Sequence, residues 1–138
     1  MMKLKKVLII LITLIIVVIV STLLHYQNMN YISENWNIDF PSENTIVYQV
    51  KPSPSFTNDG IYYEVQEVKN KNLPITLTNK KNNETEEEFN KYITEAKVSQ
   101  KQLPDFTQDY KYYKKSDVGR SLIVVAQRHK LYIVSYNL

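Results

Sequence analysis

The sequence contains no cysteine and only two glycines, Gly60 and Gly119, among its 138 residues. Without thiols the chain cannot form disulfides, thiolate metal sites, a cysteine nucleophile or a lipid-modified cysteine. Two isolated glycines cannot build the glycine-rich loops whose backbone amides close around phosphate groups. The fold must therefore be held by packing and hydrogen bonds, and nucleotide binding through such loops is excluded.

Beyond its N-terminal segment the chain has no excess of charge of either sign. Lys3, Lys5 and Lys6 account for three of the 17 Lys and Arg residues, so 14 remain, and these match the 14 Asp and Glu residues. A nucleic-acid-binding domain usually has a strong excess of cations, because binding releases counterions from the phosphates. The balance argues against nucleic acid as a partner.

One long apolar run is present at residues 7–24, and its only polar members are Thr13, Ser21 and Thr22. Hydroxyl side chains of this kind can bond back to helical carbonyl groups. As a helix the 18 residues would extend for about 27 Å, close to the roughly 30 Å hydrocarbon core of a bilayer. The run is therefore predicted to be a single transmembrane helix that contacts membrane lipid and anchors the chain in the cell membrane.

The distribution of lysine predicts the direction of this anchor. Three lysines precede the apolar run, whereas the first lysine after it is Lys51. The positive-inside rule places residues 1–6 in the cytoplasm as a basic tail and the C-terminal domain outside. Residues 25–35 are predicted to form a juxtamembrane segment. An aromatic belt at the outer membrane surface is expected from Tyr26, Tyr31 and Trp36.

A cleaved secretory signal is the alternative interpretation of the N-terminus, and it would make the chain a secreted small domain. The apolar run is longer than the roughly 7–15 residues of a signal core, and no Ala-x-Ala pattern follows it. A retained anchor is therefore favoured.

The remaining residues, 36–138, are predicted to fold as one extracytoplasmic α+β domain. Alternating apolar and polar residues indicate strands at 36–41 and 45–51, and a β-rich run follows at 61–68. The last two are expected to pair as a hairpin with a long loop. Residues 73–77 are either an edge strand or an extended linker.

A helix is expected to begin at Thr85, because Thr-Glu-Glu-Glu at 85–88 matches a capping box in which Glu88 reaches back to the first turn. Apolar residues follow at helical spacing and form one stripe. The members of this stripe are Phe89, Tyr92, Ile93 and Ala96.

Two β-rich runs at 122–127 and 131–136 flank a polar turn, which is typical of a terminal hairpin. Taken together, the elements predict a transmembrane helix followed by a mostly antiparallel sheet of about four to six strands with one packed amphipathic helix.

No arrangement of residues indicates catalysis, metal binding or a cofactor. The densest carboxylate run, Glu86 to Glu88, would point in different directions on a helix and could not converge on one ion. His25 and His129 are the only histidines, and an acid–base role for His129 would need a carboxylate in the same pocket. We therefore expect a protein that is not an enzyme and has no catalytic, metal or cofactor-binding residues.

Tyrosines and cations gather in residues 110–120, where they could stack on a sugar or contact anionic headgroups or wall polymers. The more ordinary interpretation is a strand with its tyrosines toward the core and its lysines outside. The candidate partner or polymer contacts are Tyr110, Tyr112, Tyr113, Lys114, Lys115 and Arg120.

Several short motifs are shared with a known group of proteins. They are the lysine-led anchor, Trp-Asn-Ile-Asp-Phe-Pro at 36–41, the Asp-Gly turn at 59–60 before a Tyr-rich strand, and Leu-Tyr-Ile-Val at 131–134. On these motifs the chain resembles the small, uncharacterised membrane-anchored extracytoplasmic proteins of Gram-positive bacteria. In that group another glycine often precedes the turn, where this chain has Asn58. The resemblance implies an anchored outer domain and no activity.

We accordingly expect a single-pass membrane protein whose outer domain is a non-enzymatic binding or accessory module for a membrane or envelope protein. The alternative is a module that faces an envelope polymer or anionic lipid through residues 110–120.

Overall fold

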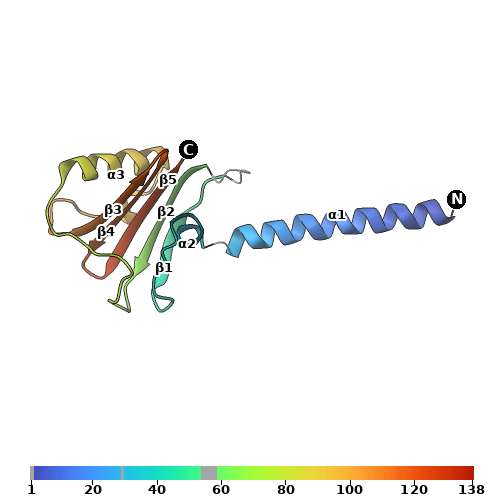
Figure 1. Ribbon diagram of the computed structural model, residues 1–138, viewed down its shortest axis with the longest axis horizontal. Helices are drawn as coiled ribbons and strands as arrows, with labels where there is room; N and C mark the ends of the chain where they lie inside the picture. The colour runs from blue at the N-terminus through green and yellow to red at the C-terminus, as the bar shows by residue number, and fades with distance from the viewer. Residues whose placement is uncertain (1, 29, 54–58) are drawn as a thin grey trace. The chain divides into compact units, whose positions relative to one another are not determined.

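The computed structural model describes residues 2–28, 30–53 and 59–138. They divide into two compact units, Met1–Asn30 and Tyr31–Leu138. The first unit is a single helix, and the second is a domain that combines a sheet with helices (Figure 1). The predicted class, an apolar N-terminal helix followed by an α+β domain, is confirmed.

Helix α1 (Met2–Asn28) includes a stretch, Lys5–Leu24, that is long and apolar enough to cross a membrane. Its hydroxyl groups are satisfied within the helix: Thr13 Oγ1 donates to the Ile9 carbonyl at 2.9 Å, and Thr22 Oγ1 donates to the Val18 carbonyl at 2.8 Å. These polar side chains therefore add no unpaired donor to an apolar surface. The helix is compatible with a membrane anchor or with a signal sequence.

The second unit contains a five-stranded sheet with the order β1-β2-β5-β4-β3, in which every neighbouring pair is antiparallel (Figure 1). The three inner strands β2, β5 and β4 are buried along most of their length. The strands are β1 (Thr45–Val50), β2 (Gly60–Glu67), β3 (Lys111–Asp117), β4 (Arg120–Gln127) and β5 (Lys130–Asn137).

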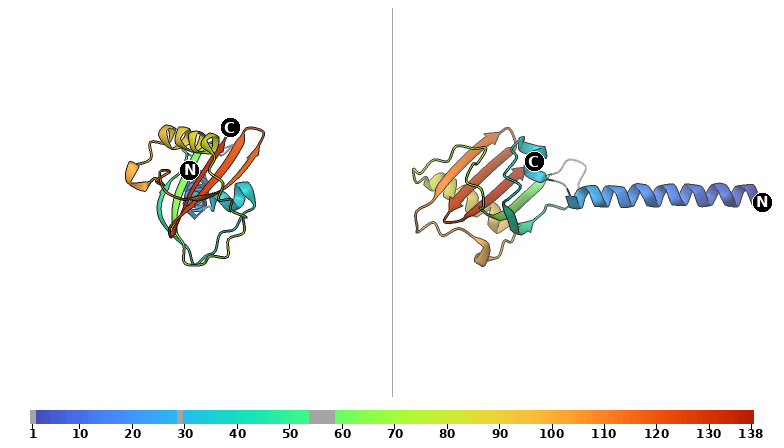
Figure 2. Two further views of the ribbon diagram at one scale, coloured as in Figure 1. Left: turned by 90° about the vertical axis from the view of Figure 1, so that its left-hand side faces the viewer. Right: turned by 90° about the horizontal axis from the view of Figure 1, so that it is seen from below.

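Two helices pack against opposite faces of this sheet (Figure 2). Helix α3 (Asn83–Glu95) buries Phe89 and Ile93 against one face, and a short 3-10 helix, η1 (Gln100–Gln102), follows it. Successive strand residues point to opposite faces, so the residues between those that touch α3 face the other way. The short helix α2 (Tyr31–Trp36) lies on that second face. Its contacts there are the ring of Tyr31 stacked on Tyr62 at 4.6 Å and a 2.7 Å hydrogen bond from Trp36 Nε1 to Ser135 Oγ.

The predicted hairpins are both confirmed. Strands β1 and β2 pair in antiparallel register around the long loop, and β4 and β5 form the terminal hairpin. The turn between β4 and β5 has only two residues, because Gln127 pairs with Lys130. Arg128 adopts a φ of 56° there, a conformation that suits the twist of a two-residue hairpin.

The strand predicted at 36–41 is wrong. Trp36 ends helix α2, and residues 37–41 form no strand. The helix closes where Asn37, with a φ of 54°, donates its amide to the Ser33 carbonyl at 2.9 Å. Trp36 is only 3% exposed in the second unit. Its burial favours the helix more strongly than a period-two pattern of a few residues favours a strand.

The predicted aromatic belt at the membrane surface is also wrong for Tyr31 and Trp36. Tyr31 and Trp36 are 1% and 3% exposed within the second unit, so their rings belong to its core and are not available to lipid headgroups. The compact unit accordingly begins at Tyr31, whereas residues 31–35 were predicted to belong to the juxtamembrane segment. Tyr26 lies outside the residues whose side chains the structure describes.

The start of α3 differs from the predicted capping box. Asn82 is the N-cap, and its Oδ1 accepts the Thr85 backbone amide at 2.9 Å. Asparagine caps a helix at least as well as threonine, and the cap lies three residues earlier than expected. The predicted stripe is confirmed, since Phe89, Tyr92 and Ile93 are buried and Ala96 packs against the same core.

Candidate functional site

A groove of about 690 Å³ lies at the end of the sheet where the β4–β5 turn is located. Its outer wall is the crossing segment, residues 68–79, which connects β2 to α3 and passes along this end toward β3 (yellow-green in Figure 1). We name it the basic groove after the cations along its rim. Its apolar lining includes Leu73, Leu77, Ala126 and Leu131.

The crossing segment follows this path because backbone hydrogen bonds hold both of its ends. The Val68 amide donates to the His129 carbonyl at 2.8 Å, and Thr78 and Tyr112 exchange two bonds of 2.8 Å as an isolated bridge. Between these points Leu73, Ile75 and Leu77 are half-buried and alternate with exposed residues. Residues 73–77 are therefore an extended linker, the second of the two alternatives left open by the sequence.

Cationic side chains dominate the charge of the basic groove. Asp109 is the one carboxylate among the described lining residues, and His129 is exposed in the turn. Helix α3 carries the opposite charge, with five glutamates and one lysine. Residues 25–138 are neutral in sum, but they include a basic end of the sheet and an acidic helix. The cations of the groove are Lys71, Lys111, Arg128 and Lys130.

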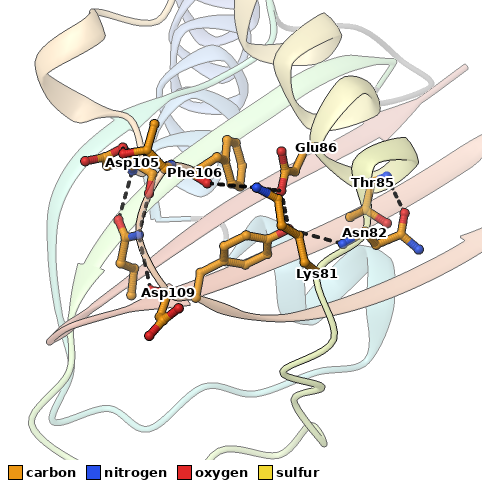
Figure 3. A network of polar contacts seen from close by, with 10 residues as sticks. Lys81, Asn82, Thr85, Glu86, Asp105, Phe106 and Asp109 are labelled. Carbon is orange, nitrogen blue, oxygen red and sulfur yellow. Dashed lines mark hydrogen bonds and ion pairs between the residues drawn. The ribbon is translucent and has the colours of Figure 1, made fainter.

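Asp109 and Tyr110 line the groove, and a polar network holds the loop at residues 105–110 against Gln127 and the start of α3 (Figure 3). Gln127 receives a bond from the Asp105 amide at 2.9 Å and donates to the Asp105 carbonyl at 2.7 Å. Tyr110 Oη donates to Glu86 Oε1 at 2.6 Å, and burial followed by this bond raises the pKa of Tyr110 to about 12. Tyr110 therefore lines the groove while its neutral hydroxyl is bonded to Glu86 at the start of α3.

A buried polar row occupies the α2 face of strand β2. Glu64, only 3% exposed, accepts a hydrogen bond from Tyr62 Oη and another from Gln66 Nε2 at 2.6 Å. Burial raises the pKa of the Glu64 carboxyl, against the effect of these bonds and of the Lys51 charge. Neither cross-strand partner of Glu64 is charged, since these are Gln49 and Ile133. The row is therefore a costly arrangement within a sheet core.

Asn44 links this row to the crossing segment. Its Nδ2 donates to Gln66 Oε1 at 3.4 Å, and its Oδ1 accepts the backbone amides of Lys69 and Asn70 at 3.0 and 3.2 Å. A continuous chain of hydrogen bonds thus runs from Glu64 to the backbone immediately before Lys71, a cation of the basic groove.

The six contact residues named from the sequence do not gather on one surface. Lys114 Nζ lies 2.5 Å from Glu88 Oε2 on the α3 face, whereas Lys115 and Arg120 lie over the Trp36 ring on the α2 face. Arg120 is also bonded to the Asn35 carbonyl at 3.1 Å. These cations make contacts within the domain.

The tyrosines of this set are divided in the same way. Tyr112 shares the α3 face with Lys114, and Tyr113 shares the α2 face with Lys115, because strand residues alternate. Of the six residues, Tyr110 alone lines the basic groove.

The carboxylates of α3 also separate. Glu86 bonds to Tyr110, while Glu88 accepts bonds from Lys114, Ser121 and Tyr92. Partial burial opposes ionisation of Glu88, but these three donors together hold its pKa below the usual value. Among residues 2–28, 30–53 and 59–138, no group of three His, Cys, Asp or Glu side chains could hold a metal ion.

The groove could not be predicted because its cations come from three separate stretches of the chain. Lys71, Lys111, Arg128 and Lys130 are brought together by the path of the crossing segment, which no local pattern encodes. Glu64 could not have been found from the local pattern, because it alternates with Tyr63 and Val65 and so is expected on the solvent-facing side of its strand.

Comparisons of the chain with models of protein families, with characterised proteins and with solved structures find no match. The functional inference therefore rests on the geometry of the groove.

Proposed function

We propose that the chain is a membrane-anchored, non-enzymatic binding module that holds a small anionic ligand with an apolar part in the basic groove outside the membrane. The observation that carries this proposal is the combination of a cationic rim with an apolar lining in one groove of about 690 Å³. That volume is within the range of small-molecule sites, which are typically about 300–1,000 Å³.

The two parts of the ligand follow from the two parts of the groove. Four cations facing one carboxylate favour a phosphate, sulfate or carboxylate group, and the effect is strongest close to a low-dielectric wall. Leu73 and Leu77 offer apolar surface that a purely inorganic anion would leave uncovered. A ligand with both features would use the whole groove.

Anchoring and orientation rest on the amino-acid composition of α1 and its flanks. Its apolar residues each favour the bilayer by about 0.3–0.6 kcal/mol, and charged residues are confined to the N-terminal side of the apolar run. The groove would then sample the extracytoplasmic space while the chain stays at the membrane.

Ligand binding is testable with three probes: phenyl phosphate, phenol and inorganic phosphate. The full-length chain in zwitterionic phosphatidylcholine nanodiscs would be titrated with each probe and followed by saturation-transfer NMR. We expect phenyl phosphate to bind most tightly, because it alone has both a charged and an apolar part, and we expect added salt to weaken its binding.

The decisive variant is the triple substitution Lys71→Gln, Lys111→Gln and Lys130→Gln. Removing three rim cations should weaken phenyl phosphate binding by about tenfold or more, since each charge-assisted contact contributes roughly 1 kcal/mol. The matched control is Lys91→Gln, Lys97→Gln and Lys101→Gln, which removes the same charge from exposed positions away from the groove. Equal losses in both triple variants, or equal binding of phenol and phenyl phosphate, would contradict the proposal.

A further inference from the structure

The hydrogen bonds from Glu64 to the crossing segment have a fixed direction. Both carboxylate oxygens of Glu64 accept, so Gln66 must turn its Nε2 toward Glu64 and its Oε1 toward Asn44. Asn44 must then donate through Nδ2, which leaves its Oδ1 for the amides of Lys69 and Asn70. Reversing any one amide would set donor against donor or acceptor against acceptor.

We propose that Glu64, Gln66 and Asn44 form a directional relay of positioning residues that fixes the Lys69–Asn70 backbone and, through it, Lys71 in the basic groove. The ligand-binding part of this inference rests on the proposed function, but the effect on the backbone does not. None of the three relay residues lines the groove.

The contact with the backbone is tested first, with Asn44→Ala in the full-length chain. Loss of the acceptor should speed hydrogen exchange at the Lys69 and Asn70 amides by about tenfold and weaken phenyl phosphate binding by a similar factor. Ser42→Ala, an exposed substitution in the same turn, should change neither quantity. If Asn44→Ala leaves both amides as protected as in the unmodified chain, the relay does not hold the segment.

Direction is tested by a pair of substitutions whose side chains do not touch each other. At pH 8, Asn44→Asp should place a carboxylate oxygen opposite Gln66 Oε1, so that two acceptors face each other. Gln66 cannot relieve this by turning its amide, because its Oε1 would then face the Glu64 carboxylate. Exchange at the two amides should rise and binding should fall by about tenfold. Glu64→Gln alone should change both by less than about twofold, because the new amide can still accept from Gln66 and donate to Tyr62.

The double variant Glu64→Gln with Asn44→Asp should rescue both readouts to within about twofold of the unmodified chain. The new amide at 64 can donate to Gln66 Oε1, and Gln66 can then donate to the new carboxylate. These two pairs are restored in the opposite direction, while Tyr62 and the Lys69 and Asn70 amides still donate as before. A double variant no better than Asn44→Asp would overturn the relay. If amide exchange is rescued while phenyl phosphate binds none of the proteins, the relay stands and the proposed function fails.

Discussion

Glu64 carries a carboxyl group in the middle of the inner strand β2, and its side chain is 3% exposed. The two groups that donate hydrogen bonds to it, the Tyr62 hydroxyl and the Gln66 amide, are neutral. Burial raises the pKa of Glu64 above the ordinary value of 4.5. The folded chain therefore binds a proton more readily than the unfolded chain at this position. Ionising Glu64 lowers the free energy of unfolding by about 1.4 kcal/mol for each unit by which its pKa is raised.

Glu64→Gln should consequently stabilise the protein in a pH-dependent manner. Below the ordinary carboxyl pKa, Glu64 is protonated in both states and the substitution should have little effect. As the pH rises through the raised folded-state pKa the unmodified chain loses stability, and the gain from Glu64→Gln should grow to about 1 kcal/mol or more and then level off. Urea unfolding of the two proteins between pH 4 and pH 9 would measure the difference.

Glu67→Gln is the matched control, because Glu67 is the exposed carboxylate at the end of the same strand. Its effect should stay within about 0.5 kcal/mol at every pH. A gain from Glu64→Gln that is constant across the pH range would show that the pKa of this carboxyl is the same in the folded and unfolded chains, and would contradict the prediction.

At the scale of the element, the N-terminus of α3 depends on one side chain. Asn82 Oδ1 accepts the Thr85 amide at 2.9 Å, and Asn82 itself is in the extended region with φ −140° and ψ 104°. Asn82→Ala should lower the free energy of unfolding by about 1 kcal/mol, because the first turn loses its cap. Thermal or urea unfolding would measure the loss.

Asn83→Ala provides the comparison for this prediction. Asn83 is exposed and already inside the first turn, so its replacement by a strong helix former should be neutral or slightly stabilising. If Asn82→Ala and Asn83→Ala have the same effect, the helix does not begin where the structure places it.

Local patterns predicted those elements whose form depends on their own residues. A period-two run predicted β1, and β-rich runs predicted β2, β4 and β5. The spacing of Phe89, Tyr92 and Ile93 predicted the buried face of α3. Residues 36–41 were misassigned because burial of Trp36 against Ser135, 99 residues away, decides the local conformation. The cap was misassigned because two adequate capping residues lie three positions apart, and their sequence alone does not choose between them.

The candidate site could be predicted far less well than the elements that build it. Lys114 and Lys115 are neighbours in the sequence, yet one pairs with Glu88 and the other lies over Trp36. Strand alternation predicts that their side chains point to opposite faces of the sheet, but the residue that each one contacts is determined by tertiary packing. The groove depends on the crossing segment, whose path is set by backbone bonds at Val68 and Thr78.

For the whole molecule, the central proposal is that α1 remains in the membrane and that Tyr31–Leu138 lies outside. A single-cysteine experiment suits this chain, because it has no native cysteine to give background labelling. Ser99→Cys places a thiol at an exposed position of the second unit, and Met2→Cys places one before the lysine cluster. A membrane-impermeant maleimide should label Ser99→Cys on intact cells and Met2→Cys only after permeabilisation.

Retention and direction can be separated in the same experiment, because each has its own physical cause. The length and apolar composition of Lys5–Leu24 determine whether the helix stays in the bilayer, while the flanking lysines determine its direction. The labelled chain should therefore remain in the membrane fraction after carbonate extraction, with the mass of the uncleaved polypeptide. A labelled fragment in the medium that lacks residues 1–24 would identify a cleaved signal, whereas labelling of Ser99→Cys only in permeabilised cells would place the groove in the cytoplasm.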